Sequence, residues 1–384
     1  MSQGDERLFL NGIDATTGGY LLTPLHPETV AAVARGQPVD PAHLRELKGW
    51  WQQRTQAHFA PMEGVDPRDL AETGWGVIFP HDVDPAIREA LQPLLKHREH
   101  QASARNTRRY REYTGSLGYR PGETKQAFLE RLGVGPGAVD PDKMPYYLLL
   151  VGSPEQISYR FQYQLDVPFA VGRLHFETPE EYARYARAVV KSETHPAPVP
   201  RRAAFFGVRN EDDPATGMSA SQLVQPLAEA LARSPAGWEV RTVLADEATK
   251  ARLSHLLGGD ETPRLLFTAS HGMGFPNSHP QQLSTQGALL CQDWPGPLNH
   301  QGAIPTDFYF SGADVAEEAS LAGLISFHFA CYGAGTPRDD DFSRRAFRAP
   351  APIAPHAFVA RLPQRLLSHP RGGALAVVGH VERA

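Results

Sequence analysis

Short apolar runs alternate with amphipathic stretches from about residue 140 to the end of the chain. Most of these runs lack strict alternation of apolar and polar positions, which is typical of strands buried on both faces of a parallel sheet. The predicted strands are Tyr146–Val151, Ala170–Leu174, Ala203–Val208, Glu239–Leu244, Arg264–Ala269, Leu324–Ala330 and Ala374–Val378. The spacing between neighbouring runs suits βαβ units, so the pattern predicts an α/β fold, with a mainly parallel sheet and helices on both of its faces.

Amphipathic helices are expected between these strands. Pro179 opens one helix, whose apolar stripe carries Tyr182 and Val189. Ser219 and Asp246 are candidate N-caps of two further helices, because their side-chain oxygens can accept from the first free amides of a helix.

The first part of the chain has a different pattern, which is mostly helical. Helical segments are expected around Asp40–His58, Asp84–His97 and Glu123–Leu132, with one strand at Gly76–Phe79. Farther along, the segment HPAPVP at His195–Pro200 cannot lie inside a helix or strand, because proline lacks an amide hydrogen. We therefore predict a mostly helical N-terminal region of unknown role at 1–140, a first α/β half-domain at 141–200 and a second half-domain at 201–384.

The composition is that of an ordinary folded protein, since 41% of the 384 residues are apolar and 21% are charged. A net charge of −5 gives no electrostatic reason to expect a nucleic-acid partner, and the basic run at residues 105–111 is interpreted as a solvated helix face or loop. The start, MSQGDERLFL, lacks the segments of a secretory signal, and no apolar run approaches the ~18 residues of a membrane span. We expect a cytoplasmic protein without a membrane partner, and two cysteines are too few for a disulfide scaffold.

Two of the predicted strands end in residues that can carry chemistry. The segment LLFTASHGMG puts His271 and Gly272 just beyond one strand, and GLISFHFACYGAGTP puts Cys331 at the end of another. Open α/β sheets bind their ligands at the carboxyl edge of the strands. If the two strands are neighbours, we expect the thiol and the imidazole to face one crevice.

A histidine beside a cysteine can take the thiol proton at neutral pH and so produce a nucleophilic thiolate. The backbone amides of Gly272 and Cys331 could hold the oxyanion that develops during attack on a carbonyl. A lone cysteine at a strand end is more often a small buried apolar residue, so the prediction depends on the conjunction of the two strand ends. A zinc hydrolase is a weaker alternative, because the chain has neither HExxH nor paired CxxC motifs, and no metal site is expected.

The Ala-Cys-x-Gly motif at residues 330–333, with a His-Gly pair upstream, resembles that of the caspase-like cysteine peptidases. Phe329 stands where the caspase signature has glutamine. The segment Tyr146–Leu174 is similar to the first half-domain of the gingipain-type branch, so the resemblance extends over about residues 145–384. It implies the caspase-like version of the α/β fold.

The resemblance also implies an activity, namely peptide-bond hydrolysis through an acyl-enzyme. It makes Cys331 the nucleophile, His271 the general base and acid, and the amides of Gly272 and Cys331 the oxyanion donors. No cofactor is needed, and the partner is a protein or peptide substrate. The N-terminal region is expected to regulate access or to recruit a regulatory protein, and self-processing or a role in bacterial defence fits other members of the clan. The alternative is a catalytically silent interaction module with the same fold.

Two further residues are candidates for substrate binding. Asp166 stands where gingipain-type peptidases have an acidic residue that can face a basic side chain before the cut, and its alternative is a turn carboxylate. Trp294 is a candidate wall of the cleft, with core packing as the alternative. His328 is expected to be a packed core histidine. Because only six residues follow the last predicted strand, we expect a fragment or a processed form of a longer protein.

Overall fold

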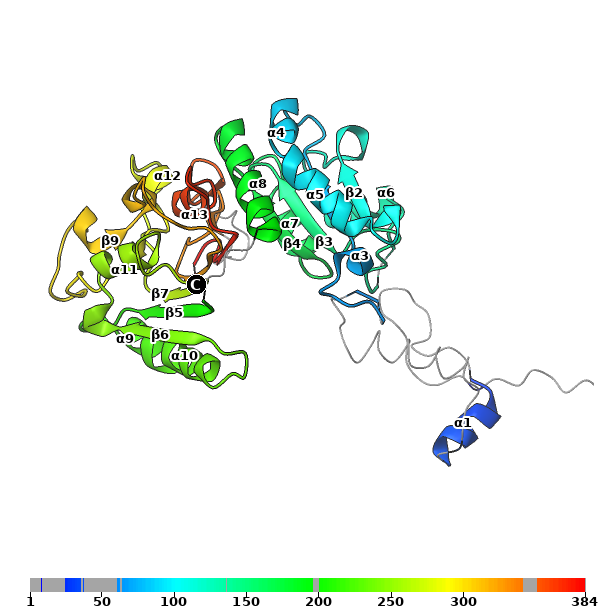
Figure 1. Cartoon of the computed structure of the whole chain (residues 1–384), viewed down its shortest axis with the longest axis horizontal. Coiled ribbons are helices and arrows are strands. Elements are labelled where there is room, and N and C mark those ends of the chain that lie inside the picture. Colours follow the sequence, from blue (N-terminus) through cyan, green and yellow to red (C-terminus); the bar gives the residue numbers. More distant parts are fainter. Residues whose placement is uncertain are drawn as a thin grey trace, which may run out of the picture. The chain divides into compact units, whose positions relative to one another are not determined.

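The computed structural model divides the chain into two units, Met1–Phe59 and Ala60–Ala384 (Figure 1). The residues that the structure describes are 8, 25–35, 37, 61–62, 64–135, 137–195, 200–340 and 351–383. In the first unit they comprise helix α1 (Pro27–Ala34) and a single antiparallel bridge between Leu8 and Leu25. The helix expected around Asp40–His58 lies outside the described residues.

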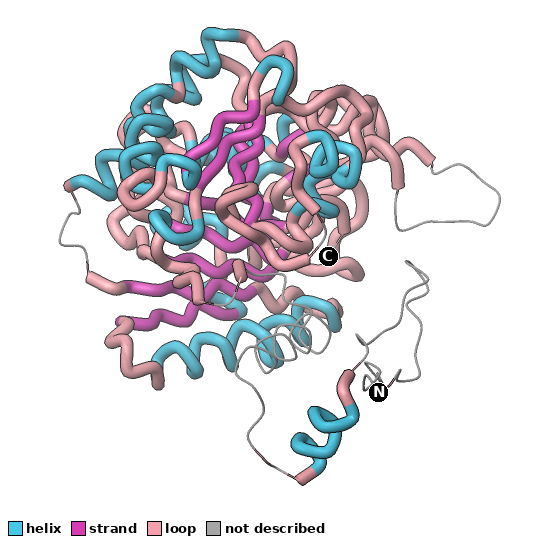
Figure 2. Tube along the Cα trace, turned by 90° about the vertical axis from the view of Figure 1, so that its right-hand side faces the viewer, coloured by secondary structure: helices cyan, strands magenta, loops and turns pink. Residues whose placement is uncertain are grey.

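The second unit contains two parallel sheets with helices between and around their strands (Figures 1 and 2). The helices described in this unit are α3 (Leu70–Thr73), α4 (Pro85–Ala90), α5 (Gln92–Ala102), α6 (Lys125–Arg131), α7 (Tyr159–Leu165), α8 (Pro179–Thr194), α9 (Pro214–Met218), α10 (Gln225–Ala232), α11 (Lys250–Leu256), α12 (Gln282–Thr285) and α13 (Arg361–Leu367). The predicted α/β class, with parallel strands and flanking helices, is confirmed. In the part of the chain that is described, no helix is both long and apolar enough to cross a membrane.

The first sheet has the strand order β2-β1-β3-β4, and all its pairs are parallel. Its strands are β1 (Trp75–Ile78), β2 (Tyr110–Tyr113), β3 (Tyr147–Val151) and β4 (Ala170–Leu174). Val77 packs with α5 and α8 on one face, whereas its neighbour Ile78 packs with α6 and α7 on the other. Both side chains are fully buried, as expected for a central parallel strand.

This sheet corrects the boundary predicted at residue 140. Strands β1 and β2 pair directly with β3, so residues 75–113 belong to the same sheet as residues 147–174. The sequence hides this because β2 is an edge strand with the charged sequence YREY, and it overlaps the basic run at residues 105–111. Two arginines of that run bind their own chain: Arg105 pairs with Glu72, and Arg109 pairs with Asp142.

The second sheet has the order β13-β10-β7-β5-β6, again with all pairs parallel. Its strands are β5 (Arg202–Gly207), β6 (Glu239–Leu244), β7 (Leu265–Ala269), β10 (Ile325–Phe329) and β13 (Ala376–Gly379). Helices α11 and α13 cover one face, where they pack on Phe206 and Leu266, and α10 covers the other, where it packs on Phe205. Each strand predicted from the apolar runs is therefore present in one of the two sheets.

Two short antiparallel pairs complete the second half of this unit. Strands β8 (Leu289–Leu290) and β9 (Tyr309–Phe310) form one, and β11 (Gly335–Thr336) and β12 (Phe358–Val359) form the other. The proline-rich segment at 195–200 lies between α8 and β5, and its residues 196–199 are outside the described part. The buried Tyr159 hydroxyl donates to the Phe358 carbonyl at 2.8 Å, which joins α7 to β12 across this junction.

Two of the predicted helix starts are wrong. Helix α9 begins at Pro214 with Asp213 as its N-cap, and a π-helical turn, η3 (Ser219–Val224), connects it to α10. Helix α11 is capped by Thr249 and not by Asp246. Several serine, threonine and aspartate residues precede each helix, so the sequence offers more than one plausible cap. The cap at Asp213 bears directly on the site described below.

Candidate active site at the carboxyl edge of the second sheet

His271 and Cys331 follow strands that are direct neighbours in the second sheet. Strands β7 and β10 pair in parallel, with Ala269 opposite Phe329, and the amide of Ser270 donates to the Phe329 carbonyl at 3.2 Å. His271 and Cys331 each lie two residues beyond this last pair. The predicted neighbourhood of the two strand ends is therefore present, at the edge where parallel sheets place their ligands.

The backbone of Gly272 lies directly against that of Cys331. A Cβ atom on Gly272 would be 1.8 Å from the Cys331 carbonyl oxygen, a distance that no side chain can occupy. The segment is fixed from the other side by β8, since the Leu290 amide donates to the His271 carbonyl at 2.9 Å. Among the described residues the Gly272 amide donates to no backbone carbonyl. Only glycine allows this close approach of the two loops.

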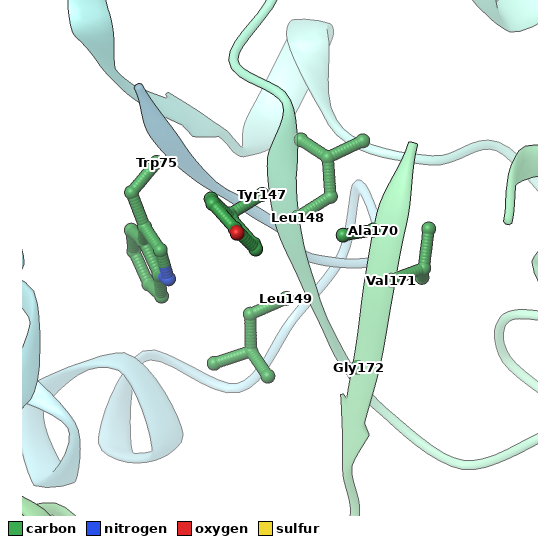
Figure 3. A pocket seen from close by; sticks show the side chains of 7 residues that line it. All are labelled: Trp75, Tyr147, Leu148, Leu149, Ala170, Val171 and Gly172. Atoms are coloured by element: carbon green, nitrogen blue, oxygen red, sulfur yellow. The ribbon is translucent and has the colours of Figure 1, made fainter. Parts of the chain in front are cut away.

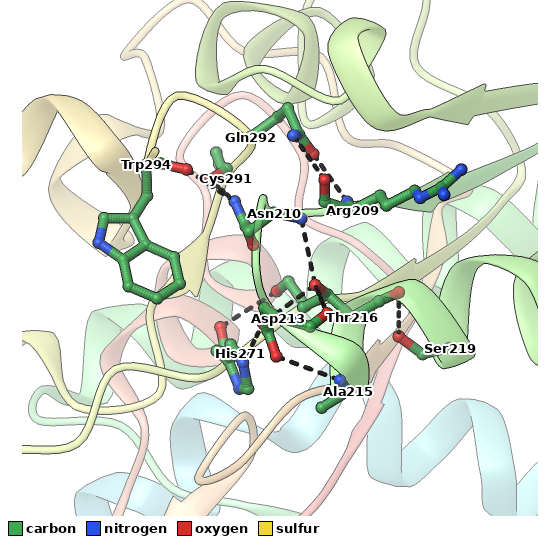
Figure 4. Close-up of polar contacts among 11 residues, drawn as sticks. Arg209, Asn210, Asp213, Ala215, Thr216, Ser219, His271, Cys291, Gln292 and Trp294 are labelled. Carbon is green, nitrogen blue, oxygen red and sulfur yellow. Dashed lines mark hydrogen bonds and ion pairs between the residues drawn. The ribbon is translucent and has the colours of Figure 1, made fainter. Parts of the chain in front are cut away.

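The imidazole of His271 is bound by a carboxylate that the sequence did not suggest. Its Nε2 atom lies 2.7 Å from Oδ2 of Asp213, whose side chain is only 9% exposed, whereas that of His271 is 42% exposed (Figure 4). Burial alone would raise the pKa of Asp213, but His271, the Thr216 hydroxyl and the Ala215 amide together hold that pKa below its ordinary value. A charged carboxylate on Nε2 leaves Nδ1 as the nitrogen that can exchange a proton with a reacting group.

A hydrogen-bond chain holds Asp213 in place. The Thr216 hydroxyl donates to Asp213 Oδ2 at 3.0 Å and accepts from the Asn210 amide at 3.1 Å (Figure 4). The buried Asn210 side chain in turn donates to the carbonyl of Trp294 at 2.9 Å. The loop after β5 is thus tied to the loop after β8, with the imidazole of His271 beside both. Hydrogen bonds of this kind restrict the positions of buried side chains, although the Oδ1 atom of Asn210 has no partner among the described residues.

Asp213 is the functional candidate that the sequence analysis missed. It occurs in the acidic stretch Glu211–Asp213 ahead of Pro214, where it has the ordinary appearance of a helix N-cap, and it does cap α9. The available signal was its position: Asp213 follows β5, which pairs with β7, the strand that leads to His271. Because β5, β7 and β10 are parallel neighbours, the residues that follow all three strands lie at the same edge of the sheet.

Residues 331–335, named here the Cys331 loop, are held by the segment that follows β13. The Tyr332 amide donates to the Glu382 carbonyl at 2.6 Å, and the Ala334 amide donates to the His380 carbonyl at 2.9 Å. Tyr332 has a φ of 59°, a left-handed conformation that is uncommon for a residue with a side chain. The turn that presents Cys331 is therefore a strained one, supported by its neighbours.

The two cysteines have opposite environments. Cys291 is fully buried, and burial, reinforced by Asp293, raises the pKa of its thiol well above the ordinary value. Cys331 is partly exposed at the sheet edge. His328, in the strand before Cys331, is also fully buried, and burial lowers its pKa to about 4. A neutral core imidazole cannot serve as the base, in agreement with its predicted packing role.

The two predicted substrate-binding residues lie in other settings. Asp166 caps the carboxyl end of α7, and its Oδ1 atom accepts from the Val171 amide at 3.1 Å, at the amino end of β4. Asp166, which was predicted to select a basic side chain, is therefore a carboxylate in the turn between α7 and β4. It lies near the amino ends of the strands of the first sheet and not near their carboxyl ends. Trp294 is 9% exposed and meets His271 edge-on, with ring centroids 6.4 Å apart. It supports the imidazole from the core and does not wall an open cleft.

Neither of two cavities in the described part of the chain is lined by His271 or Cys331. One of about 270 Å³ lies on the first sheet toward the amino ends of its strands (Figure 3). It is lined by Trp75, Tyr147, Leu148, Leu149, Ala170, Val171 and Gly172. The only titratable side chain among these lining residues is that of Tyr147, so the lining offers no carboxylate, imidazole or thiol as a catalytic acid or base. Across the described residues, no cluster of three or more His, Cys, Asp or Glu side chains could hold a metal ion.

No protein-family model matches this chain, and no curated protein matches it. Among solved structures, one described as the structure of a protease is 12% identical with a TM-score of 0.46, and covers 82% of this chain and 61% of its own. A complex of the pro- and mature domains of RgpB from Porphyromonas gingivalis is 14% identical with a TM-score of 0.46, and covers 81% of this chain and 64% of its own. The Arg-specific cysteine proteinase gingipain R is 12% identical with a TM-score of 0.45, and covers 83% of this chain and 63% of its own.

The chain thus spans less than two-thirds of the length of the structures it matches.

Proposed function

We propose that this protein is a cysteine endopeptidase in which Cys331 is the nucleophile, His271 the general base and acid, and Asp213 the residue that orients His271. The proposal is carried by one observation: a carboxylate-bound imidazole and a partly exposed thiol follow paired strands, and Gly272 lies in backbone contact with Cys331. A nucleophile, a base, an orienting group and an oxyanion donor are the parts that acyl transfer needs.

The reaction follows from these parts. His271 accepts the thiol proton as Cys331 Sγ attacks the carbonyl carbon of the scissile bond, and the carbonyl oxygen takes up the negative charge beside the Gly272 amide. Collapse of this intermediate breaks the C–N bond, and His271 returns its proton to the departing amine. Water then attacks the thioester, giving its proton to His271, and the second product leaves as a carboxylic acid with the free thiol restored.

A cut after arginine or lysine is part of the proposal, although Asp166 does not support it. The carboxylate of Asp166 is engaged by the Val171 amide at the amino end of β4. A basic specificity must then come from other carboxylates near the site, and the cleavage test described next measures it.

The deciding experiment is cleavage of a diverse peptide library by the purified chain, with the products identified by mass spectrometry. We expect cuts that cluster after one residue type, and we expect His271→Ala and Cys331→Ser to lose them while their thermal unfolding stays close to that of the parent. Cys291→Ala is the matched control and should cut normally, because Cys291 is sealed in the core. Absence of cleavage by the parent chain would favour the catalytically silent interaction module.

A further inference from the structure

Two buried glutamine side chains lie between the segment that follows His271 and the end of the Cys331 loop. Gln282 and Gln286 are one turn apart at α12, and they are only 1% and 3% exposed. Thr336, the residue directly after the Cys331 loop, is fully buried. The mechanism above uses none of these three. Buried amides and hydroxyls are stable in a fold when they are hydrogen-bonded, so their partners show which segments they join.

Gln286 makes one hydrogen bond to each of the two segments. Its Nε2 atom donates to Oγ1 of Thr336 at 2.8 Å. Its Oε1 atom accepts from the Phe275 amide at 3.0 Å. Phe275 lies four residues beyond His271, and Thr336 lies five residues beyond Cys331. A single side chain thus connects the continuations of β7 and β10.

Gln282 holds the side chain of Gln286 in place. Its Nε2 atom donates to Oε1 of Gln286 at 3.2 Å and to the Ile353 carbonyl at 2.7 Å. Its Oε1 atom accepts from the Ser278 amide at 3.1 Å. All four polar atoms of the two amide groups therefore have partners. A buried pair that is fully hydrogen-bonded in this way has little freedom to change rotamer.

The residue after Gln286 touches the Cys331 loop through its backbone. A Cβ atom on Gly287 would be 2.1 Å from the Tyr332 carbonyl oxygen, and the φ of Gly287 is 82°. Only glycine fits such a left-handed position at this distance. A displacement of Gln286 would therefore be passed directly to the loop that carries the thiol.

We propose that Gln286 is a positioning residue that fixes the Cys331 loop relative to His271. It acts through the Thr336 hydroxyl on one side and through the Phe275 amide on the other. Its role in turnover rests on the proposed peptidase function, whereas the connection between the two segments does not. A small misplacement of a nucleophile and its base slows the chemical step while substrate binding is retained.

Thr336→Val tests the connection, because valine has nearly the shape of threonine but lacks the hydroxyl. We expect kcat to fall about fivefold with KM unchanged, as for the loss of one neutral hydrogen bond. Thr336→Ser keeps the hydroxyl and should restore a kcat close to that of the parent. Thr73→Val is the matched control, since Thr73 is fully buried in α3 and its hydroxyl donates to the Asp69 carbonyl at 2.9 Å. It should leave kcat unchanged.

A double variant separates the effect of Gln286 from general loosening of the loop. Gln286→Met has a side chain of similar length but cannot bind Thr336. Once Gln286 is replaced, Thr336→Val has no hydrogen bond left to remove. We therefore expect the double variant to have the kcat of Gln286→Met alone, which is the non-additivity that two residues in contact show.

Hydrogen–deuterium exchange at the Phe275 amide gives a readout that does not need catalysis. Thr336→Val leaves the segment after His271 unchanged in sequence, so a change at Phe275 reports transmission between the two segments. We expect the protection factor to fall about fivefold in Thr336→Val, in line with one lost hydrogen bond. Thr336→Ser and Thr73→Val should keep the parent value.

Parent-like kcat and parent-like protection in Thr336→Val would overturn the proposal, and so would lost protection with kcat unchanged. An equal fall in Thr336→Ser or Thr73→Val, or additive losses in the double variant, would also overturn it. If either Gln286→Met or Thr336→Val does not fold, the other decides against Thr73→Val. If the parent chain cuts no peptide, the peptidase is refuted, and the exchange pattern alone decides whether Gln286 connects the two segments.

Discussion

A Cβ atom placed on Gly272 would lie 1.8 Å from the carbonyl oxygen of Cys331, so these two residues touch through their backbones. We therefore expect Gly272→Ala to push the loops of the two strands apart and to misplace both His271 and Cys331. Overpacking of this kind costs about 1–3 kcal/mol of stability, and peptide cleavage should be lost. Thermal unfolding and kcat measure the two effects.

Gly274→Ala is the control for this substitution. A Cβ at Gly274 would meet only the Tyr332 ring, at an ordinary contact distance of 3.5 Å. It should leave both stability and cleavage close to those of the parent. If Gly272→Ala behaved in the same way, the backbone contact would not be what brings the two strand ends together.

Replacing Asp213 should impair proton transfer at His271. In Asp213→Asn the amide group can donate to Nε2, which leaves the proton on Nδ1 and removes the lone pair that the thiol proton needs. We expect kcat to fall by about 10²–10⁴-fold, the usual contribution of a positioned general base. Asp212→Asn, in the same loop but exposed, serves as the control and should cut normally. A normal kcat in Asp213→Asn would remove Asp213 from the mechanism.

Asp213 should also affect the stability of the fold at acidic pH. Because the folded pKa of Asp213 lies below its ordinary value of 3.8, its stabilising effect is fully present above that value. The effect is lost as the pH falls through the lower, folded pKa. Unfolding midpoints in denaturant, measured at a series of acidic pH values, should therefore drop less steeply below 3.8 for Asp213→Asn than for the parent. Parallel curves would contradict the pairing with His271.

The two thiols should differ widely in reactivity. Cys331 is partly exposed, whereas Cys291 is buried, with a pKa raised chiefly by that burial. At neutral pH, iodoacetamide should label Cys331 at least tenfold faster, since only an accessible thiolate reacts. Intact-mass and peptide mapping measure both rates, and Cys291→Ala should leave the fast rate unchanged. Slow and equal labelling would argue against an activated nucleophile at Cys331.

His328 should make the fold sensitive to mild acid. The pKa of His328 in the folded chain, about 4, lies below the ordinary 6.5. At a pH between these two values, His328 is therefore protonated in the unfolded chain but neutral in the folded chain. Stability should decrease by on the order of 3 kcal/mol across that window. His328→Leu removes the titration, so its denaturant midpoint should change less over the same window. An equal decrease in variant and parent would show that other groups cause it.

The location of the candidate site followed from the sequence because it depends on simple rules. Parallel strands end at one edge, and the apolar runs before His271 and Cys331 were long enough to identify both strands. Asp213 was missed because a capping aspartate and an orienting aspartate have the same local sequence, and only the pairing of β5 with β7 separates them. The order of strands in a sheet is a property of long-range packing, which local patterns do not encode.

Asp166 is a second residue whose local sequence allows two readings. A single acidic residue in a weakly similar segment was assigned a substrate role, yet its carboxylate satisfies the backbone of the turn into β4. Asp side chains bind nearby amides so readily that a turn is the default explanation for one that precedes a strand. The boundary at residue 140 failed for a related reason, because the charged edge strand β2 lacks the apolar pattern by which strands are recognised.

The parallel pairing of β1 with β3 sets a limit on how the gene can be shortened. A truncated chain that starts at residue 141 would lack β1, so β3 would have no partner strand on that side. The buried side chains of Leu148 and Leu150 would then become more exposed. Two remaining parallel strands do not form an independently stable sheet. Expression of such a piece should yield insoluble material, whereas a start near residue 60 preserves the whole layer.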